Sequence, residues 1–174
     1  SYNNGSNIFW GLAGNDTITL KGDGSRAYGG DGDDIITLLG SACQVYGEAG
    51  NDTINLDKAS VVVEGGDGDD NLEINNSGNA YGDDGDDVIT INSNIASNQI
   101  VNGGLGNDTY NINAKVTNLS DTGGDNIYNV NANDINISGG PGADTFYLSG
   151  NNNTVLGAGG DDYFVIDGSN NFID

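Results

Sequence analysis

Residues 65–70 read Gly-Gly-Asp-Gly-Asp-Asp, one copy of a hexapeptide, Gly-x-x-Gly-x-Asp, that decides the fold of this 174-residue chain. The pattern recurs at residues 11–16, 29–34, 47–52, 65–70, 82–87, 103–108, 139–144 and 157–162, with a weaker copy at 121–126. Most copies start 18 residues apart, but the step from 65 to 82 is one residue short and the step from 82 to 103 is three residues long. A short, nearly fixed period of this kind predicts a stack of repeats and not a globular domain.

A strand is expected after each copy, because apolar and polar residues alternate there as in a half-buried strand. Two places past the final Asp, every repeat has an apolar residue: Ile18, Ile36, Ile54, Leu72, Ile89, Tyr110, Tyr128, Phe146 and Phe164. Four places past it the residues are again apolar: Leu20, Leu38, Leu56, Ile74, Ile91, Ile112, Val130, Leu148 and Ile166. The position between them is mostly Thr or Asn, so one face of the strand should be core and the other wet.

A second, looser strand is expected late in each repeat, around the residues Ala27, Val45, Val63, Ala80, Val101, Leu119, Ile137, Val155 and Ile173. Each repeat is then one turn of a coil, and successive turns pair as parallel strands about 4.8 Å apart. The corner between the two strands reads differently from turn to turn, as in residues 21–24, 39–42, 57–60 and 151–153. We therefore expect one tightly specified edge and one edge without a shared pattern.

The glycines and aspartates of the hexapeptide indicate a cation site. Glycine allows the tightly curved, positive-φ backbone that turns several carbonyl oxygens toward one point. Oxygen-only ligands suit calcium better than zinc or copper. Stacking would also place like charges about 5 Å apart, where they repel by roughly 0.8 kcal/mol in water and roughly 3 kcal/mol at an effective dielectric of about 20. The column that needs cations consists of Asp16, Asp34, Asp52, Asp70, Asp87, Asp108, Asp144 and Asp162.

The corner with its strand, as in residues 103–111, resembles the RTX (hemolysin-type) calcium-binding nonapeptide, and the resemblance extends over residues 11–167. It implies an all-β fold, a right-handed parallel β-roll of about nine 18-residue turns. It also implies calcium ions between adjacent corners, bound by the eight aspartates above and by backbone carbonyls. Those carbonyls would belong to Gly29, Asp31, Gly32, Gly47, Ala49, Gly50, Gly65, Asp67, Gly68, Gly82, Asp84, Gly85, Gly103, Leu105 and Gly106.

Two departures from the family pattern change what the resemblance implies. The motif occupies one edge only, so we expect one row of calcium ions instead of the usual two. The copy at 121–126 has Asp121 in place of the first glycine and Asn126 in place of the last Asp. Which of Asp121, Asp125 and Asn126 supplies a ligand there stays open.

The composition agrees with a metal-built fold outside the cell. A formal net charge of −22, with 30 Gly and one Pro, would favour disorder without bound cations. Folding and calcium binding should therefore be one event, at the near-millimolar calcium found outside cells. The single Cys43 excludes an internal disulfide and suits a small buried thiol. We expect one segment over residues 1–174 of a longer protein, with partial turns at 1–10 and 168–174.

Function is expected to be structural. The chain has no histidine and no carboxylate pair outside the calcium pattern, so we expect no catalysis, and Glu64 and Glu73 are interpreted as solvated strand positions. A segment of a secreted or cell-surface bacterial S-layer protein or adhesin is favoured, exported by the type I pathway typical of RTX proteins. The alternative is an accessory module of a secreted protease, lipase or polysaccharide epimerase. An ice-binding role is less favoured, because the outer Thr and Asn rank decays to Glu73, Tyr147 and Val165.

Partners other than calcium follow from the outer faces. Self-assembly or contact with neighbouring domains fits a scaffold, and a row of aromatic residues could meet a surface polysaccharide or a partner protein. Stacked rings that only stabilise the sheet are the favoured interpretation of that row. Nucleic acid is excluded by the negative charge, and no segment is apolar enough to span a membrane. The row consists of Trp10, Tyr28, Tyr46 and Tyr81.

Overall fold

The computed structural model describes residues 6–58, 62–93, 100–116 and 119–174, and these form two parallel β-sheets. The ten-stranded sheet holds β1 (Ile8–Ala13), β3 (Arg26–Asp31), β5 (Gln44–Ala49), β7 (Val62–Asp67), β9 (Asn79–Asp84), β11 (Val101–Leu105), β13 (Leu119–Ser120), β15 (Asn136–Ser138), β17 (Thr154–Leu156) and β19 (Phe172–Ile173). The nine-stranded sheet holds β2 (Thr17–Leu20), β4 (Ile35–Leu38), β6 (Thr53–Leu56), β8 (Asn71–Ile74), β10 (Val88–Ile91), β12 (Thr109–Ile112), β14 (Ile127–Val130), β16 (Thr145–Leu148) and β18 (Tyr163–Ile166).

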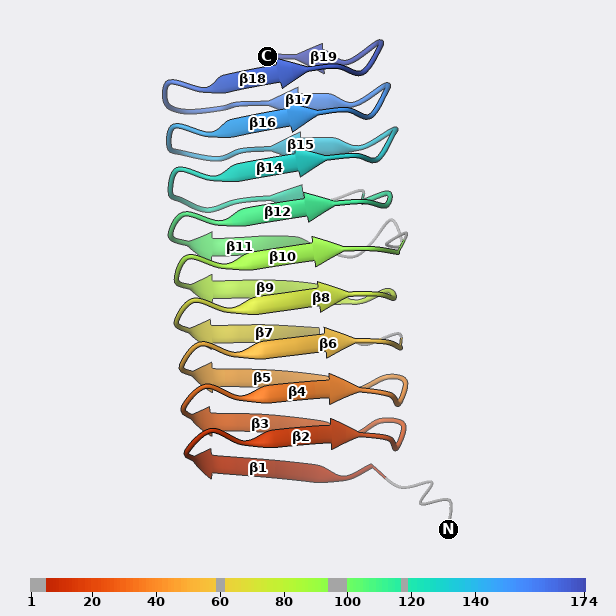
Figure 1. Cartoon of the computed structure of the whole chain (residues 1–174), viewed down its shortest axis with the longest axis vertical. Coiled ribbons are helices and arrows are strands. Elements are labelled where there is room, and N and C mark those ends of the chain that lie inside the picture. Colours follow the sequence, from red (N-terminus) through yellow and green to blue (C-terminus); the bar gives the residue numbers. More distant parts are fainter. Residues whose placement is uncertain (1–5, 59–61, 94–99, 117–118) are drawn as a thin grey trace.

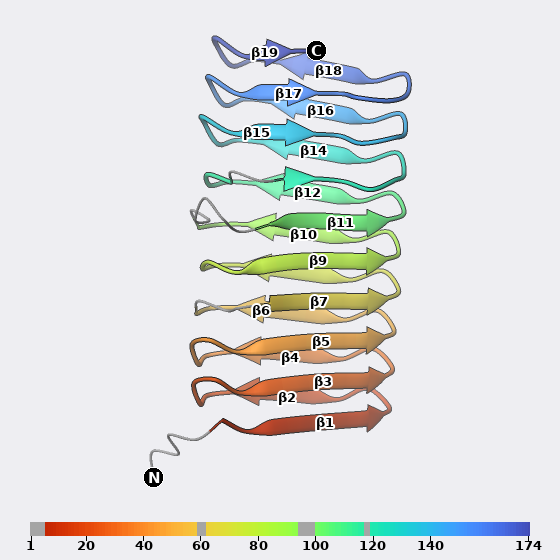
Figure 2. The same cartoon turned by 180° about the vertical axis from the view of Figure 1, so that it is seen from behind.

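The chain winds as a β-solenoid, alternating between the two sheets once per turn, so the predicted fold class is confirmed (Figure 1). The hexapeptide corners all lie on one side of the stack, which we call the first edge, at the left in Figure 1 and at the right in Figure 2. The other connections form the second edge. Each hexapeptide corner is named below by its first residue, and the contact between two successive corners is called a junction, as in junction 65/82.

The strand register keeps equivalent residues in one column. Ile54 pairs with Ile36 on one side and Leu72 on the other, and Leu72 pairs with Ile89 across the 17-residue step. Ile89 in turn pairs with Tyr110 across the 21-residue step. The irregular repeat lengths therefore leave the nine-stranded sheet in register. The extra residues of the long step include 94–99, which lie outside the described part.

The core lies between the sheets and consists of the predicted inward columns. Ile36, Ile54 and Val63 are fully buried, as are most of their column neighbours. From Tyr110 onward the column nearest the first edge becomes aromatic, with rings stacked in parallel at centroid distances of 4.7, 4.6 and 4.8 Å along Tyr110, Tyr128, Phe146 and Phe164. Ile166 in β18 is 45% exposed, because β18 is the last strand of its sheet and is covered on one side only.

The outer face of the ten-stranded sheet carries the predicted aromatic row in part. Trp10, Tyr28 and Tyr46 stack with centroid distances of 4.0 and 5.0 Å, and Glu64 follows Tyr46 in the same register. Tyr28 is stacked on both sides, whereas Trp10, in the first strand, is 59% exposed. This geometry suits stabilisation between neighbouring strands better than a platform for stacking sugars.

The second edge is more regular than its sequence suggests, so the expectation of no shared pattern is wrong for much of it. Gly24 and Ala42 occupy equivalent places and both have a left-handed φ, of 66° and 56°. Asp134, Asn152 and Asn170 repeat this turn in the C-terminal turns, with φ of 56–58°. Gly, Asn and Asp tolerate that conformation readily, so one turn geometry accepts several sequences. The predicted corner residues Ala59 and Ser60 lie outside the described part.

Candidate metal centre on the first edge

The corner backbone of the first edge is held in one conformation at every regular copy. The fourth position is always glycine with positive φ, as in Gly32 (124°) and Gly68 (125°). The second position also has positive φ, even where it is not glycine, as in Glu48 and Asp83 (both 81°). A non-glycine residue is strained there, so stacking of the corners overrides local preference.

The sixth-position aspartates form a continuous ladder through the corners. In each step the backbone N–H of one sixth-position residue donates to Oδ1 of the next, as in Asp52 N to Asp70 Oδ1 at 2.7 Å. The eight steps have N···O distances of 2.7–3.0 Å and run through Asp16, Asp34, Asp52, Asp70, Asp87, Asp108, Asn126, Asp144 and Asp162. Each of these aspartates from Asp34 onward therefore uses one carboxylate oxygen to join two turns, and Asp16 contributes only its N–H.

The second carboxylate oxygen, Oδ2, is buried and has no hydrogen-bond partner in Asp34, Asp52, Asp70, Asp87, Asp108 and Asp144. At corners 11, 29, 47, 65, 82 and 139, Oδ2 and the first-position carbonyl of the next corner both lie beside the corner's own first-position glycine. A Cβ placed on Gly29 would lie under 3.0 Å from both Asp34 Oδ2 and the Gly47 carbonyl oxygen. A buried carboxylate oxygen without a donor is costly, and a cation beside it would remove that cost.

The raised pKa values of these carboxyl groups also indicate a cation site. Burial, before any other cause, raises the pKa of Asp70 to about 7 and that of Asp87 to about 8, and neighbouring aspartates raise both further. The pKa of Asp52 and that of Asp144 each rise to about 6, again mainly through burial. The protein alone therefore makes these carboxyl groups harder to ionise than a free aspartate, and a bound divalent cation would oppose that effect.

Oxygens of the backbone complete the candidate sites, but not all predicted carbonyls are placed alike. The first-position carbonyls of Gly29, Gly47, Gly65, Gly82 and Gly103 face the space beside the preceding glycine. The third-position carbonyls of Asp31, Ala49, Asp67, Asp84 and Leu105 already accept a backbone N–H from the fourth-position glycine of the preceding turn, at 2.7–2.8 Å. The fourth-position carbonyls of Gly32, Gly50, Gly68 and Gly85 face the next fourth-position glycine.

A second ladder, which the sequence analysis missed, runs along the exposed fifth positions. Asp33 Oδ1 accepts the Asn51 backbone N–H at 3.0 Å, and Asn51 Oδ1 accepts the Asp69 N–H at 3.0 Å. The ladder reaches Ala143, whose N–H donates to Asp125 Oδ1 at 2.7 Å, and it depends on Asn or Asp at this place in every earlier copy. The regular Asn or Asp at the fifth position was the sequence signal that could have predicted this ladder. These side chains cap backbone groups and are exposed, so they are not assigned to the cation site.

Corner 121 differs from the others in the way that its sequence suggested. Asp121 is 7% exposed, and its Oδ1 accepts the Gly123 N–H at 2.8 Å. Asn126 keeps the ladder, since its Oδ1 accepts the Asp108 N–H at 2.8 Å. Asp125 belongs to the exposed ladder. Of the three residues left open by the sequence, only Asp121 brings an additional carboxylate to the buried column.

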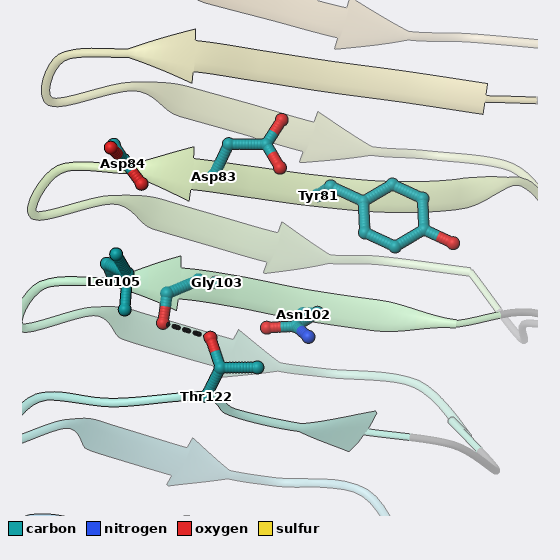
Figure 3. Close-up of a pocket in the computed structure, with 8 residues that line it drawn as sticks. Tyr81, Asp83, Asp84, Asn102, Gly103, Leu105 and Thr122 are labelled. Carbon is teal, nitrogen blue, oxygen red and sulfur yellow. Dashed lines mark hydrogen bonds between the residues drawn. The ribbon is translucent and has the colours of Figure 1, made fainter.

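The outer side of the same corners carries a shallow cavity of about 220 Å³ (Figure 3). Tyr81, Asp83 and Asp84 on β9 lie above Asn102 and Leu105 on β11, and Thr122 donates from Oγ1 to the Gly104 carbonyl at 2.6 Å. Glu64 is half-buried close by, and burial, with a smaller effect of Asp83, raises its pKa. Glu64 is therefore not the fully solvated residue expected from the sequence.

The remaining reactive side chain, the Cys43 thiol, belongs to the core. The Cys43 thiol is buried and lies 3.4 Å from the Gly22 carbonyl oxygen, and burial raises its pKa, which suits an inert core thiol. Among the described residues, no three His, Cys, Asp or Glu side chains gather around one point. Each regular junction instead combines one carboxylate with backbone oxygens, a hard donor set that suits calcium. No helix in the described part is long and apolar enough to cross a membrane.

A parallel solenoid with one edge lined by buried oxygens is the architecture of a calcium-binding repeat module. The protein-family model of the RTX calcium-binding nonapeptide repeat matches four times, over residues 2–24, 25–41, 46–73 and 136–173. The chain belongs to the RTX calcium-binding nonapeptide repeat family. The region between 73 and 136, which no copy of the family model covers, contains the irregular steps and corner 121. No curated protein and no solved structure matches the chain.

Proposed function

We propose that this chain is a calcium-built structural segment of a secreted or cell-surface bacterial protein of the S-layer or adhesin type, with no catalytic activity of its own. Six buried, unpartnered carboxylate oxygens in one column are the observation that carries the proposal. Calcium between the turns would turn a self-repelling stack into a stiff rod. RTX repeat proteins are typically secreted, and extracellular calcium is sufficient for sites of this weak, backbone-rich kind.

At the junctions between the nine corners, the proposed ligands are the first-position carbonyls and the sixth-position aspartates, with Asp121 at the variant corner. These aspartates are Asp16, Asp34, Asp52, Asp70, Asp87, Asp108 and Asp144, and Asp162 would bind only an ion beyond corner 157. At each regular junction one ion would be held by Asp Oδ2 and the facing carbonyl. The structural role fits the shape of the molecule, because the turns stack in one straight column with the same corner repeated along one side (Figure 2). A regular rod of this kind can set a spacing or stiffen a stalk.

The scaffold role is tested by the mass of the calcium-loaded protein in solution. We expect calcium-dependent assemblies in size-exclusion chromatography with light scattering, and ordered arrays or filaments in negative-stain micrographs. Magnesium at the same concentration is the control and should not replace calcium, because it prefers rigid octahedral sites. A calcium-folded protein that stays monomeric at all concentrations would favour the other candidate, an accessory module of a secreted protease, lipase or epimerase.

A further inference from the structure

Two tyrosine hydroxyl groups reach the first edge from inside the core, at the two junctions that corner 121 forms. The column that contains them is aliphatic from Ile36 to Ile89 and becomes Tyr at positions 110 and 128 and Phe at 146 and 164. Tyrosine occurs in this column only at the two junctions that corner 121 forms.

Junction 121/139 contains no carboxylate at the sixth position. Asn126 stands there, its Oδ1 accepts the Asp108 N–H, and its Nδ2 donates to the Gly124 carbonyl at 3.3 Å. The Gly139 carbonyl, which corresponds to the carbonyl that faces Asp Oδ2 at a regular junction, accepts the Tyr128 hydroxyl at 3.1 Å. The Asn126 amide and the Tyr128 phenol thus supply hydrogen-bond donors in the place where a regular junction would hold a cation.

Junction 103/121 has the opposite composition. Asp108 is fully buried with Oδ2 unpartnered, and Asp121 adds a second, nearly buried carboxylate. The Tyr110 hydroxyl donates to Asp121 Oδ2 and accepts the Gly103 N–H, both at 2.5 Å. A Cβ on Gly103 would lie under 3.0 Å from both Asp108 Oδ2 and Tyr110 Oη, where a regular junction has the next carbonyl.

We propose that corner 121 shifts one carboxylate from junction 121/139 to junction 103/121. Junction 103/121 is then a two-carboxylate cation site with a phenol oxygen beside it, and junction 121/139 is closed by protein groups without a cation. This inference rests on the proposed calcium row. The nine corners form eight junctions, so the row holds seven ions, with a gap after the strongest site. Greater ligand charge raises calcium affinity, so junction 103/121 should fill first.

The gap is tested by gain of an ion. The double variant Asn126→Asp with Tyr128→Phe gives junction 121/139 a carboxylate and frees the Gly139 carbonyl. Equilibrium dialysis with elemental analysis should then show one more calcium per chain than in the parent protein. The matched control is Phe146→Tyr, which places a hydroxyl near the Gly157 carbonyl at regular junction 139/157 and should remove one ion. An unchanged stoichiometry in a calcium-folded double variant would overturn the gap.

The two-carboxylate site is tested with terbium, a luminescent calcium substitute that tyrosine sensitises at short range. The first terbium ion should bind next to Tyr110, so Tyr110→Phe should remove most of the emission of the first step. Asp121→Asn keeps the size of the side chain and should weaken that step at least tenfold. Equal affinity and emission of the first step in both variants would overturn this site. If the parent protein binds no calcium, the proposed function itself fails, whereas binding without these differences contradicts only the inference.

Discussion

The two edges of the solenoid stack the same turns with different chemistry. On the first edge, Asp70 uses Oδ1 to accept the N–H of Asp52 and leaves Oδ2 buried without a donor. On the second edge, Asn153 uses Oδ1 to accept the N–H of Ile135 at 3.1 Å, and its Nδ2 donates to the Ala132 carbonyl at 3.1 Å. Asn171 repeats this arrangement, with Nδ2 bonded to the Gly150 carbonyl at 3.0 Å.

An amide side chain satisfies both neighbouring turns by itself, whereas an ionised carboxylate leaves one oxygen that needs a donor or a cation. Asn supplies one acceptor and one donor group, so it satisfies both neighbours. Ionised Asp supplies two acceptors, and the second must find a donor or a metal. At corner 121, the amide of Asn126 replaces the carboxylate on the first edge. If calcium fills the row as proposed, the distribution of Asp and Asn determines which contacts between turns depend on calcium.

The largest effect is expected from filling the space beside a regular carboxylate. Gly47→Ala places a methyl group under 3.0 Å from Asp52 Oδ2 and the Gly65 carbonyl, so the turns must separate. We expect a loss of about 3 kcal/mol or more in the calcium-loaded protein, measured by urea unfolding. Gly123→Ala is the control, because its Cβ meets only Leu105 at 3.6 Å. Equal stability of the two variants would remove the argument for a tight site.

Replacing an amide of the second edge by a carboxylate should have the next largest effect on stability. Asn153→Asp removes the donor to the Ala132 carbonyl and buries a charge in its place, which should lower the free energy of unfolding by about 2 kcal/mol at neutral pH. Lowering the pH should recover part of this loss, because a protonated carboxyl group can donate. Chemical unfolding at two pH values measures both effects. A variant as stable as the parent at neutral pH would show that the amide donor is unimportant.

The reverse exchange on the first edge should be milder in stability but clear in metal content. Asp70→Asn keeps the acceptor for the Asp52 N–H, so we expect one fewer bound calcium with a loss of only about 1 kcal/mol in calcium. In EDTA the same variant should be more stable than the parent, because a buried charge has gone. Asp70→Ala, which lacks both groups, should be worse in either condition. Unchanged calcium stoichiometry in Asp70→Asn would exclude Asp70 as a ligand.

The smallest effect is a pH dependence that changes sign with calcium. Burial raises the pKa of Asp52, Asp70, Asp87 and Asp144 in the folded chain to about 6–8, above the usual value of 3.8. The metal-free fold therefore binds protons more tightly than the unfolded chain and loses stability as the pH rises from about 4 to 8. With calcium, acid should instead destabilise by displacing ions. Circular dichroism against pH, with EDTA or calcium, distinguishes the two trends. The same pH dependence in EDTA and in calcium would contradict the proposal that the buried aspartates bind calcium.

Much of the fold was accessible from the sequence, because a strict column such as Ile36, Ile54 and Leu72 fixes register and inward face together. The sixth-position aspartates were found in the same way. The second edge was missed, since its turn depends on a φ value that Gly24, Ala42 and Asn152 reach with different side chains. The spacing of 18 between Asn153 and Asn171 was the available signal.

The roles of the two core tyrosines were also beyond the sequence. Tyr110 and Tyr128 satisfied the apolar pattern, and nothing in that pattern tells where a hydroxyl group points. Only the structure shows that the hydroxyls reach the Asp121 carboxylate and the Gly139 carbonyl. The change from Ile to Tyr at residue 110 is visible in the sequence, close to the irregular corner. The contacts of the hydroxyl groups are needed to explain it.

The central claim is that calcium between the turns builds the first edge. A calcium titration of EDTA-stripped protein, following far-UV circular dichroism and bound metal together, tests it most directly. We expect a cooperative gain of β signal, with several ions bound per chain, at calcium concentrations on the order of those outside cells. A complete β signal in EDTA with no metal bound after calcium addition would contradict it, and the buried carboxylates would then have to be protonated in the native fold.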